Sequence, residues 1–130
     1  MRLADLLAGY PVEVQGGGDR DIERIVSDSR QAVPDALFVA IRGGQEEDRH
    51  DFVADAVARG AAAIMVECEI DCVPATRILV DDCRQWLPRL ASRFYGEPAR
   101  QLRCVGVTGT NGKTTTAWLL HRILHTSKPA

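Results

Sequence analysis

The sequence lacks the features that mark a nucleic-acid binder, a membrane protein or a secreted protein. Sixteen Lys and Arg residues face 18 Asp and Glu residues, so the net charge is -2 and no excess of basic residues supports nonspecific nucleic-acid binding. No apolar run approaches the ~20 residues of a membrane span. The N-terminus, MRLADLLAGYPVEV, has neither the apolar stretch nor the small-residue cleavage site of a secretory signal. We therefore expect a cytoplasmic protein with no nucleic-acid or membrane partner.

Cysteine is scarce, and its spacing matches no metal or redox motif. None of the four cysteines belongs to a C-x-x-C pair, and Cys68 and Cys72 are separated by three residues. A zinc site and a disulfide framework are therefore both disfavoured. In a chain that is 45% hydrophobic and has no secretory signal, we expect reduced, partly buried thiols at Cys68, Cys72, Cys83 and Cys104.

The apolar pattern of residues 1–99 predicts a small α/β domain. Residues 2–8 form a short amphipathic helix that Gly9 and Pro11 end. Strands are predicted at 22–26, 36–41, 62–66 and 76–80, and the continuous apolar run 36–41 indicates a strand buried on both faces. A helix from residue 50 ends at Gly60 and has four apolar positions at helical spacing: Phe52, Val53, Ala56 and Val57.

A second long helix follows residue 80. Asp81 or Asp82 caps it, which is a better explanation of this pair than a catalytic role. Pro88 lies within its apolar pattern and either kinks the helix or marks its true start. Residues 95–100, YGEPAR, predict a linker, with a domain boundary near residue 99. The apolar positions of this helix are Trp86, Leu87, Leu90, Ala91 and Phe94.

The segment 107–116, VTGTNGKTTT, has the composition of a phosphate-binding loop. It stands between a predicted strand at 102–107 and a predicted helix at 114–125, which is the context such a loop requires. Gly109 and Gly112 permit close backbone approach, and Lys113 can reach the β- and γ-phosphates of a nucleotide. Thr114 can place its hydroxyl on a magnesium ion. The helix should turn inward four apolar residues, Ala117, Leu120, Ile123 and Leu124.

The loop departs from the common pattern G-x-x-x-x-G-K-[ST], because Val107 stands where the first glycine is expected. The run GVTGTNGKTTT resembles instead the nucleotide loop of the Mur ligases, which reads G-T-x-G-K-[ST]. SDSRQAVPDALFVAIRG, FVADAVARGAAAIMVE and RFYGEP extend the resemblance over nearly the whole chain. Within the family, Asp28-Ser29-Arg30 with Thr110-Asn111 favours the members that add the third residue of the peptidoglycan stem peptide over those that act at the next step.

The resemblance implies a fold, a reaction and ligands. Residues 1–99 would form an α/β domain that binds a uridine nucleotide, and residues 100–130 would begin the ATP-binding central domain. The enzyme would use ATP and Mg²⁺ to join meso-diaminopimelate or L-lysine to UDP-N-acetylmuramoyl-L-alanyl-D-glutamate through an acyl phosphate. It would act as a monomer at full length. We also expect the 130-residue chain to be an N-terminal portion without ligase activity of its own.

The site residues come from the same resemblance. The UDP part of the substrate would contact Ser27, Ser29, Gly44, Gln45 and Glu46, because hydroxyl, amide and loop N–H groups can recognise a uracil edge and diphosphate oxygens. Lys113 would be the catalytic cation and Thr114 the metal-binding residue. The ATP-phosphate loop would consist of Gly109, Thr110, Asn111, Gly112, Lys113, Thr114 and Thr115.

Simpler structural roles compete with several of these assignments. Ser27 and Ser29 can cap a turn, and Arg30 can form a surface ion pair. His121 and His125 lie four residues apart but lack the pattern of a zinc motif, so surface or packing roles are expected. Two functions outside this ligase class also remain: a uridine-nucleotide-binding module without catalysis, and a phosphate-loop NTPase unrelated to cell-wall synthesis.

Overall fold

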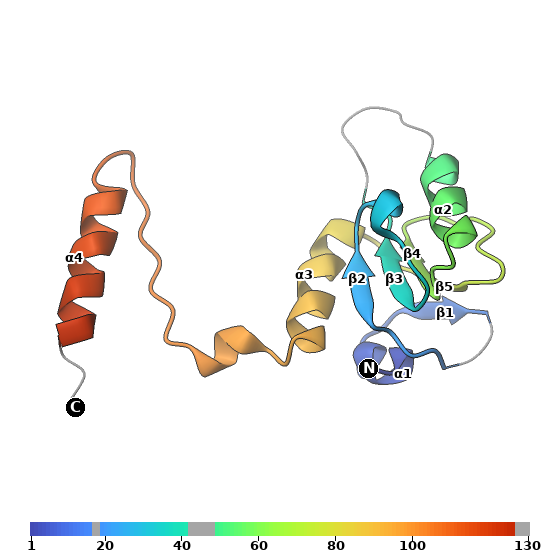
Figure 1. Ribbon diagram of the computed structural model, residues 1–130, viewed down its shortest axis with the longest axis horizontal. Helices are drawn as coiled ribbons and strands as arrows, with labels where there is room; N and C mark the ends of the chain where they lie inside the picture. Colours follow the sequence, from blue (N-terminus) through green and yellow to red (C-terminus); the bar gives the residue numbers. More distant parts are fainter. Residues whose placement is uncertain (17–18, 42–48, 127–130) are drawn as a thin grey trace. The chain divides into compact units, whose positions relative to one another are not determined.

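The computed structural model describes residues 1–16, 19–41 and 49–126. The chain divides into two compact units, Met1–Pro98 and Ala99–Ala130, which we call unit 1 and unit 2. Unit 1 contains all the strands of the described chain, and unit 2 contains one long helix (Figure 1). No helix in the described ranges is long and apolar enough to cross a membrane.

A five-stranded mixed sheet forms the centre of unit 1. Its strand order is β1-β5-β4-β3-β2, in which β2 to β5 are mutually parallel and β1 is antiparallel to β5. Every residue of β3 and β4 is buried, as expected for strands covered on both faces. The strands are β1 (Glu13–Gln15), β2 (Arg24–Val26), β3 (Ala36–Val39), β4 (Ala63–Val66) and β5 (Thr76–Leu79).

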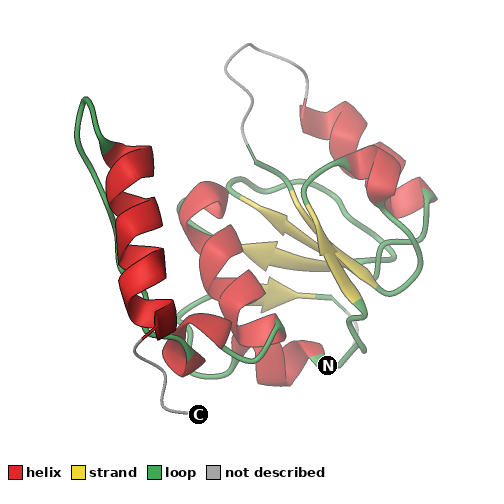
Figure 2. Cartoon of the chain, turned by 60° about the vertical axis from the view of Figure 1, so that its left-hand side comes forward, coloured by secondary structure: helices red, strands yellow, loops and turns green. Residues whose placement is uncertain are grey.

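Helices cover both faces of this sheet (Figures 1 and 2). Helices α1 (Leu3–Leu7) and α3 (Cys83–Phe94) pack with Leu37, Met65 and Ile78 in one apolar cluster. Helix α2 (Arg49–Ala58) packs with Phe38 and Ile64 in a second cluster on the other face. Neighbouring residues of a strand point to opposite faces, so β3 and β4 contribute to both clusters. The prediction of an α/β fold is confirmed.

Hydrogen bonds around Gly60 end helix α2 and begin the connection to β4. Gly60 has φ of 89°, a conformation that favours glycine, and its N–H donates to the Val57 carbonyl at 2.9 Å. The Ala61 N–H donates to the Ala56 carbonyl at 3.1 Å. These two bonds form a Schellman motif, as the position of Gly60 predicted. Of the four apolar positions at helical spacing, Val53 and Ala56 are buried, whereas Phe52 is 42% exposed.

Helix α3 begins at Cys83, and Pro88 lies inside it, so the alternative that Pro88 marks its start is wrong. Asp82 is the N-cap: its carboxylate accepts from the N–H groups of Arg84 and Gln85. The Gln85 side chain also donates to Asp82, and these hydrogen bonds hold the pKa of the Asp82 carboxyl below its usual value. The helix therefore starts where its cap is best satisfied, before the proline.

Arg93 joins α3 to the first turn of the chain. Its guanidinium donates to the carbonyls of Leu6 at 3.0 Å and Ala8 at 2.6 Å, and lies 3.9 Å from the centre of the Tyr10 ring. Tyr10 in turn packs edge-on against the buried Trp86. The Arg93 guanidinium therefore satisfies carbonyl groups at the C-terminal end of α1, which have no hydrogen-bond donor within the helix. Its position over the Tyr10 ring adds a cation–π interaction.

Thr76 is a buried polar side chain whose hydroxyl has no hydrogen-bond partner among the described residues. Thr76 is 1% exposed. An unsatisfied buried hydroxyl costs roughly 1–3 kcal/mol. We expect Thr76→Val to raise the free energy of unfolding by about 1 kcal/mol, because it replaces the hydroxyl with a methyl group of similar size.

Urea denaturation followed by circular dichroism measures this change in the intact chain. Thr76→Ser is the matched control, since it keeps the hydroxyl, loses the methyl group and should be less stable than the parent. A valine variant no more stable than the parent would contradict the prediction.

Unit 2 differs from its sequence prediction in two respects. Residues 102–107 form no strand, because a strand requires a neighbour to pair with and the described part of unit 2 has none. Helix α4 (Lys113–Thr126) forms as expected, but its apolar residues are not inward: Ile123 and Leu124 are 59% and 57% exposed. Ala117 is also exposed, and Leu120 is partly exposed. A short 3-10 helix, η2 (Pro98–Gln101), begins at the junction with unit 1.

Candidate functional site

Residues 108–112 form a turn that leads directly into the first residue of α4, Lys113. Gly109 has φ of 147° and Gly112 φ of 76°, and side chains rarely accept either value, so both glycines are needed for this path. The first helical hydrogen bond of α4 runs from the Thr116 N–H to the Gly112 carbonyl at 2.9 Å. The N–H groups that precede it have no partner within the helix and are free to bind an anion.

The Lys113 side chain folds back over this turn. Its ammonium group donates to the carbonyl oxygens of Gly109 at 2.6 Å and Thr110 at 3.3 Å. The Lys113 ammonium group therefore lies beside the segment that supplies the backbone N–H groups at the start of α4. Binding of a phosphate to Lys113 would require the ammonium group to exchange these carbonyl contacts for phosphate oxygens.

These residues fit a nucleoside triphosphate with magnesium in their chemistry. The turn offers backbone amides, the positive end of the α4 dipole and one ammonium group, which are the donors that phosphate oxygens require. Thr114 and Thr115 lie in the first turn of α4 and are exposed. Magnesium is commonly bound by one or two protein oxygens together with phosphate oxygens and water, and the Thr114 hydroxyl could be one of them. Asn111 completes the turn and is exposed.

The second group of predicted site residues follows β2. Ser27 is exposed, and Ser29 opens the 3-10 helix η1 (Ser29–Gln31) and is 5% exposed. Asp28 caps η1 by accepting from the Arg30 N–H at 3.0 Å. The Arg30 guanidinium also pairs with Asp28 at 2.7 Å, so Arg30 does form the surface ion pair considered as an alternative. These hydrogen bonds from Arg30 hold the pKa of the Asp28 carboxyl below its usual value.

Helix α2 contributes Asp55 to this turn, a residue that the sequence did not single out. Its carboxylate pairs with Arg59 Nε at 2.9 Å, one helical turn further on. Arg59 and, second, a hydrogen bond from the Ser29 hydroxyl lower the pKa of the Asp55 carboxyl. The spacing of Asp55 and Arg59 could have indicated the ion pair, but nothing in the sequence places Asp55 beside Ser29.

The remaining predicted contacts are Gly44, Gln45 and Glu46, and these lie outside the described residues. Ser27 and Ser29 stand in one turn of unit 1, whereas residues 109–115 lie together in unit 2. Each group is therefore assembled within its own unit.

Other chemical candidates have structural roles. His121 and His125 stack with their ring centres 5.5 Å apart on exposed positions of α4. Asp81 accepts from the Trp86 indole at 2.8 Å, which confirms a structural role for the aspartate pair. None of the four cysteines forms a disulfide, and Cys72 and Cys83 are buried. Trp118 is 56% exposed and lies beneath the Arg122 guanidinium.

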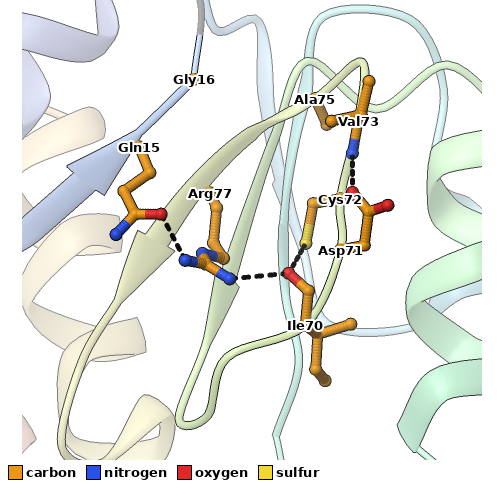
Figure 3. Close-up of a pocket in the computed structure, with 8 residues that line it drawn as sticks. All are labelled: Gln15, Gly16, Ile70, Asp71, Cys72, Val73, Ala75 and Arg77. Atoms are coloured by element: carbon orange, nitrogen blue, oxygen red, sulfur yellow. Dashed lines mark hydrogen bonds between the residues drawn. The ribbon is translucent and has the colours of Figure 1, made fainter.

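A pocket of about 210 Å³ lies at the start of β5, lined by Gln15, Ile70, Cys72 and Arg77 among others (Figure 3). The Arg77 guanidinium donates to the Ile70 carbonyl at 3.0 Å and to the Gln15 side chain. Arg77 therefore ties the edge strand β1 to the loop before β5. Burial raises the pKa of the Cys72 thiol, which disfavours a reactive thiolate there.

Comparison with known proteins identifies a family for the chain. The family model described as "Mur ligase family, catalytic domain" matches residues 21–95. The UDP-N-acetylmuramoyl-L-alanyl-D-glutamate–2,6-diaminopimelate ligase of Caldanaerobacter subterraneus is 41% identical over 125 residues, which are 95% of this chain and 26% of that protein. The chain therefore spans about a quarter of the length of the curated relatives it matches.

Solved structures agree with these sequence matches. The structure of a UDP-N-acetylmuramoyl-L-alanyl-D-glutamate–2,6-diaminopimelate ligase superposes with a TM-score of 0.69 at 26% identity, over 97% of this chain and 26% of that one. The MurF ligase of Thermotoga maritima, solved in complex with ADP, has a TM-score of 0.57 at 32% identity over 81% of this chain and 24% of its own. Because the family model covers more than half of the sequence and these structures share its fold, the chain belongs to the Mur ligase family.

Proposed function

We propose that this chain supplies the uridine-nucleotide-binding unit and the ATP-phosphate loop of a ligase that builds the peptide stem of peptidoglycan. The enzyme would add meso-diaminopimelate or L-lysine to UDP-N-acetylmuramoyl-L-alanyl-D-glutamate in the cytoplasm, as a monomer. The observation that carries the proposal is the 41% identity to a ligase named for this substrate and for 2,6-diaminopimelate, since it extends over 95% of the chain.

The reaction has two steps. A carboxylate oxygen of the nucleotide-linked dipeptide attacks the γ-phosphorus of ATP and releases ADP, which leaves an acyl phosphate. The amino group of the diamino acid then attacks the acyl carbon, and phosphate leaves as the amide bond forms. Mg²⁺, when bound, neutralises charge on the phosphates. Such catalysis depends on positioning and on charge stabilisation.

Each unit has a part in this scheme. In unit 2, Lys113 binds and neutralises the terminal phosphates, residues 109–115 surround them, and Thr114 offers an oxygen to Mg²⁺. In unit 1, Ser27 and Ser29, with Gly44, Gln45 and Glu46, bind the UDP part of the substrate. The support is the lysine that lies over the glycine turn in unit 2 and the polar turn after β2 in unit 1.

Calorimetric titration of the chain with UDP-N-acetylmuramoyl-L-alanyl-D-glutamate tests the proposal. We expect saturable one-to-one binding, and much weaker binding of GDP, because the recognition site is formed for uracil. Equal affinity for the two ligands, or no binding of the uridine nucleotide, would contradict the proposal.

A MurF-type ligase is the second candidate, favoured by the 32% identity to the Thermotoga maritima MurF ligase. Because that enzyme class acts at the next step of stem synthesis, its substrate already carries the third residue. Titration with the corresponding UDP-linked tripeptide separates the two candidates: tighter binding of the tripeptide than of the dipeptide would favour the MurF type.

A further inference from the structure

We propose that the pocket at the start of β5 binds a small α-amino acid, whose carboxylate pairs with Arg77 and whose ammonium group pairs with Asp71 (Figure 3). The pocket lies between the end of β1 and the loop that connects β4 to β5. This is the amino end of the parallel strands, whereas the turn that contains Ser27 follows the carboxyl end of β2. The site is therefore separate from the described nucleotide contacts of unit 1 and does not depend on the proposed function.

The cation of this pocket is Arg77, whose side chain is 16% exposed. Its guanidinium donates to two neutral oxygens, those of the Ile70 carbonyl at 3.0 Å and of the Gln15 side chain. The Glu69 carboxylate is 4.0 Å away and 77% exposed, so water screens that pair. A guanidinium has five N–H donors, and the described residues accept from two of them, so donors remain for the carboxylate of a ligand.

The pocket also carries an acidic group, Asp71. One oxygen of its carboxylate, Oδ1, accepts from the Val73 N–H at 3.1 Å. The other oxygen, Oδ2, has no hydrogen-bond partner among the described residues, and Asp71 forms no ion pair with Arg77. An ammonium group suits this oxygen because it is a compact cation with three donors.

The two charges lie on either side of one buried side chain, Cys72 (Figure 3). Burial raises the pKa of the Cys72 thiol, while Arg77 lowers it and Asp71 raises it, so both charges act on this position. A purely anionic ligand would be repelled by Asp71, and a purely cationic ligand would be repelled by Arg77. An α-amino acid satisfies both, because its opposite charges are joined through a single carbon atom.

The volume of the pocket sets the size of the ligand. An apolar cavity of roughly 150 Å³ holds benzene, so a pocket of about 210 Å³ has room for about eight non-hydrogen atoms, the number in valine. Ile70, Val73 and Ala75 line the pocket and offer apolar contacts to the valine side chain. L-Valine is therefore the probe of choice.

The test is a titration of the intact chain with L-valine, isovalerate and isobutylamine, followed through the chemical shifts of backbone amides. Isovalerate is valine without its ammonium group, and isobutylamine is valine without its carboxylate. We expect L-valine to bind with a Kd roughly tenfold lower than that of either analogue, because only L-valine pairs with both charges. The Val73 amide signal should shift, since this N–H donates to Asp71.

Two variants identify the acidic partner without disturbing Arg77, which also ties β1 to the loop before β5. Asp71→Asn removes the charge but retains a side-chain oxygen that can accept from the Val73 N–H. It should raise the Kd of L-valine roughly tenfold and leave isovalerate binding no weaker. Glu69→Gln is the matched control, since it removes an exposed carboxylate that is not among the described residues lining the pocket, and it should not weaken L-valine binding.

Equal affinity for L-valine and isovalerate would overturn the inference, because the ammonium group would then have no partner. An unchanged Kd for L-valine in Asp71→Asn, an equal loss of affinity in Glu69→Gln, or the absence of saturable L-valine binding would overturn it as well. None of these results bears on the binding of the uridine nucleotide, so each would leave the proposed function in place.

Discussion

Replacement of Lys113 by methionine is expected to weaken ATP binding by roughly 100-fold, because two charge-assisted hydrogen bonds to phosphate oxygens are lost together. Lys113 is the first residue of α4, and its ammonium group already lies beside the loop, on the carbonyls of Gly109 and Thr110. Methionine keeps an unbranched side chain one atom shorter than that of lysine and removes the charge. Calorimetric titration of the chain with ATP in excess Mg²⁺ measures the change.

Arg122→Met is the matched control. Arg122 lies on the same helix, and its guanidinium stacks 5.1 Å from the Trp118 ring centre rather than on the loop. Removing this charge changes the net charge by the same amount but should alter ATP affinity less than about threefold, since exposed charges beyond about 10 Å are screened in physiological salt. If both variants lose affinity equally, Lys113 has no specific role in phosphate binding.

The second large effect is expected in the core of unit 1. Leu37 lies on β3, one of the three inner strands, and is fully buried in the cluster shared with α1 and α3. Leu37→Ala removes buried methyl groups and leaves a cavity, which typically costs 2–5 kcal/mol. We expect a loss of about 3 kcal/mol, a large fraction of the roughly 5–15 kcal/mol that stabilises a domain.

Urea denaturation followed by tryptophan fluorescence measures this loss, because Trp86 belongs to the same cluster. Phe52→Ala removes a larger side chain that is 42% exposed on α2, and it should cost about 1 kcal/mol or less. Similar losses in the two variants would show that the sheet does not bury Leu37 as the structure indicates.

The inner strands could be predicted from the sequence because their environment is uniform. Every residue of β3 and β4 is buried, so the continuous apolar runs at 36–41 and 62–66 have one simple explanation. The helix ends were also predictable, since Gly60 and Asp82 form their caps through bonds within a few residues. In these segments local chemistry and the final fold agree.

The sequence failed where pairing over a long distance decides the structure. Strand β1 was missed because its three residues are exposed and only Val14 is apolar; it exists because Val14 pairs with Ile78. The opposite error occurred at 102–107, where an apolar run met no neighbouring strand among the described residues. A strand is defined by its partner as much as by its residues.

The candidate sites also differ in whether local sequence or long-range packing determines their geometry. The glycine turn and Lys113 are contiguous in sequence, so the motif predicts their geometry. The position of Asp55 next to the turn after β2 depends on the packing of α2 against η1, and no local pattern reveals it.

The pairing of β1 with β5 has a consequence for synthesis on the ribosome. Residues 13–15 can find their partners only after residues 77–79 have left the exit tunnel, and the Arg93 bonds to Leu6 and Ala8 form later still. Residues 13–15 must therefore wait without their strand partner until most of unit 1 has been translated. Strand pairing between residues far apart in the chain slows folding. A chaperone would therefore be most useful before residues 77–79 have emerged from the ribosome.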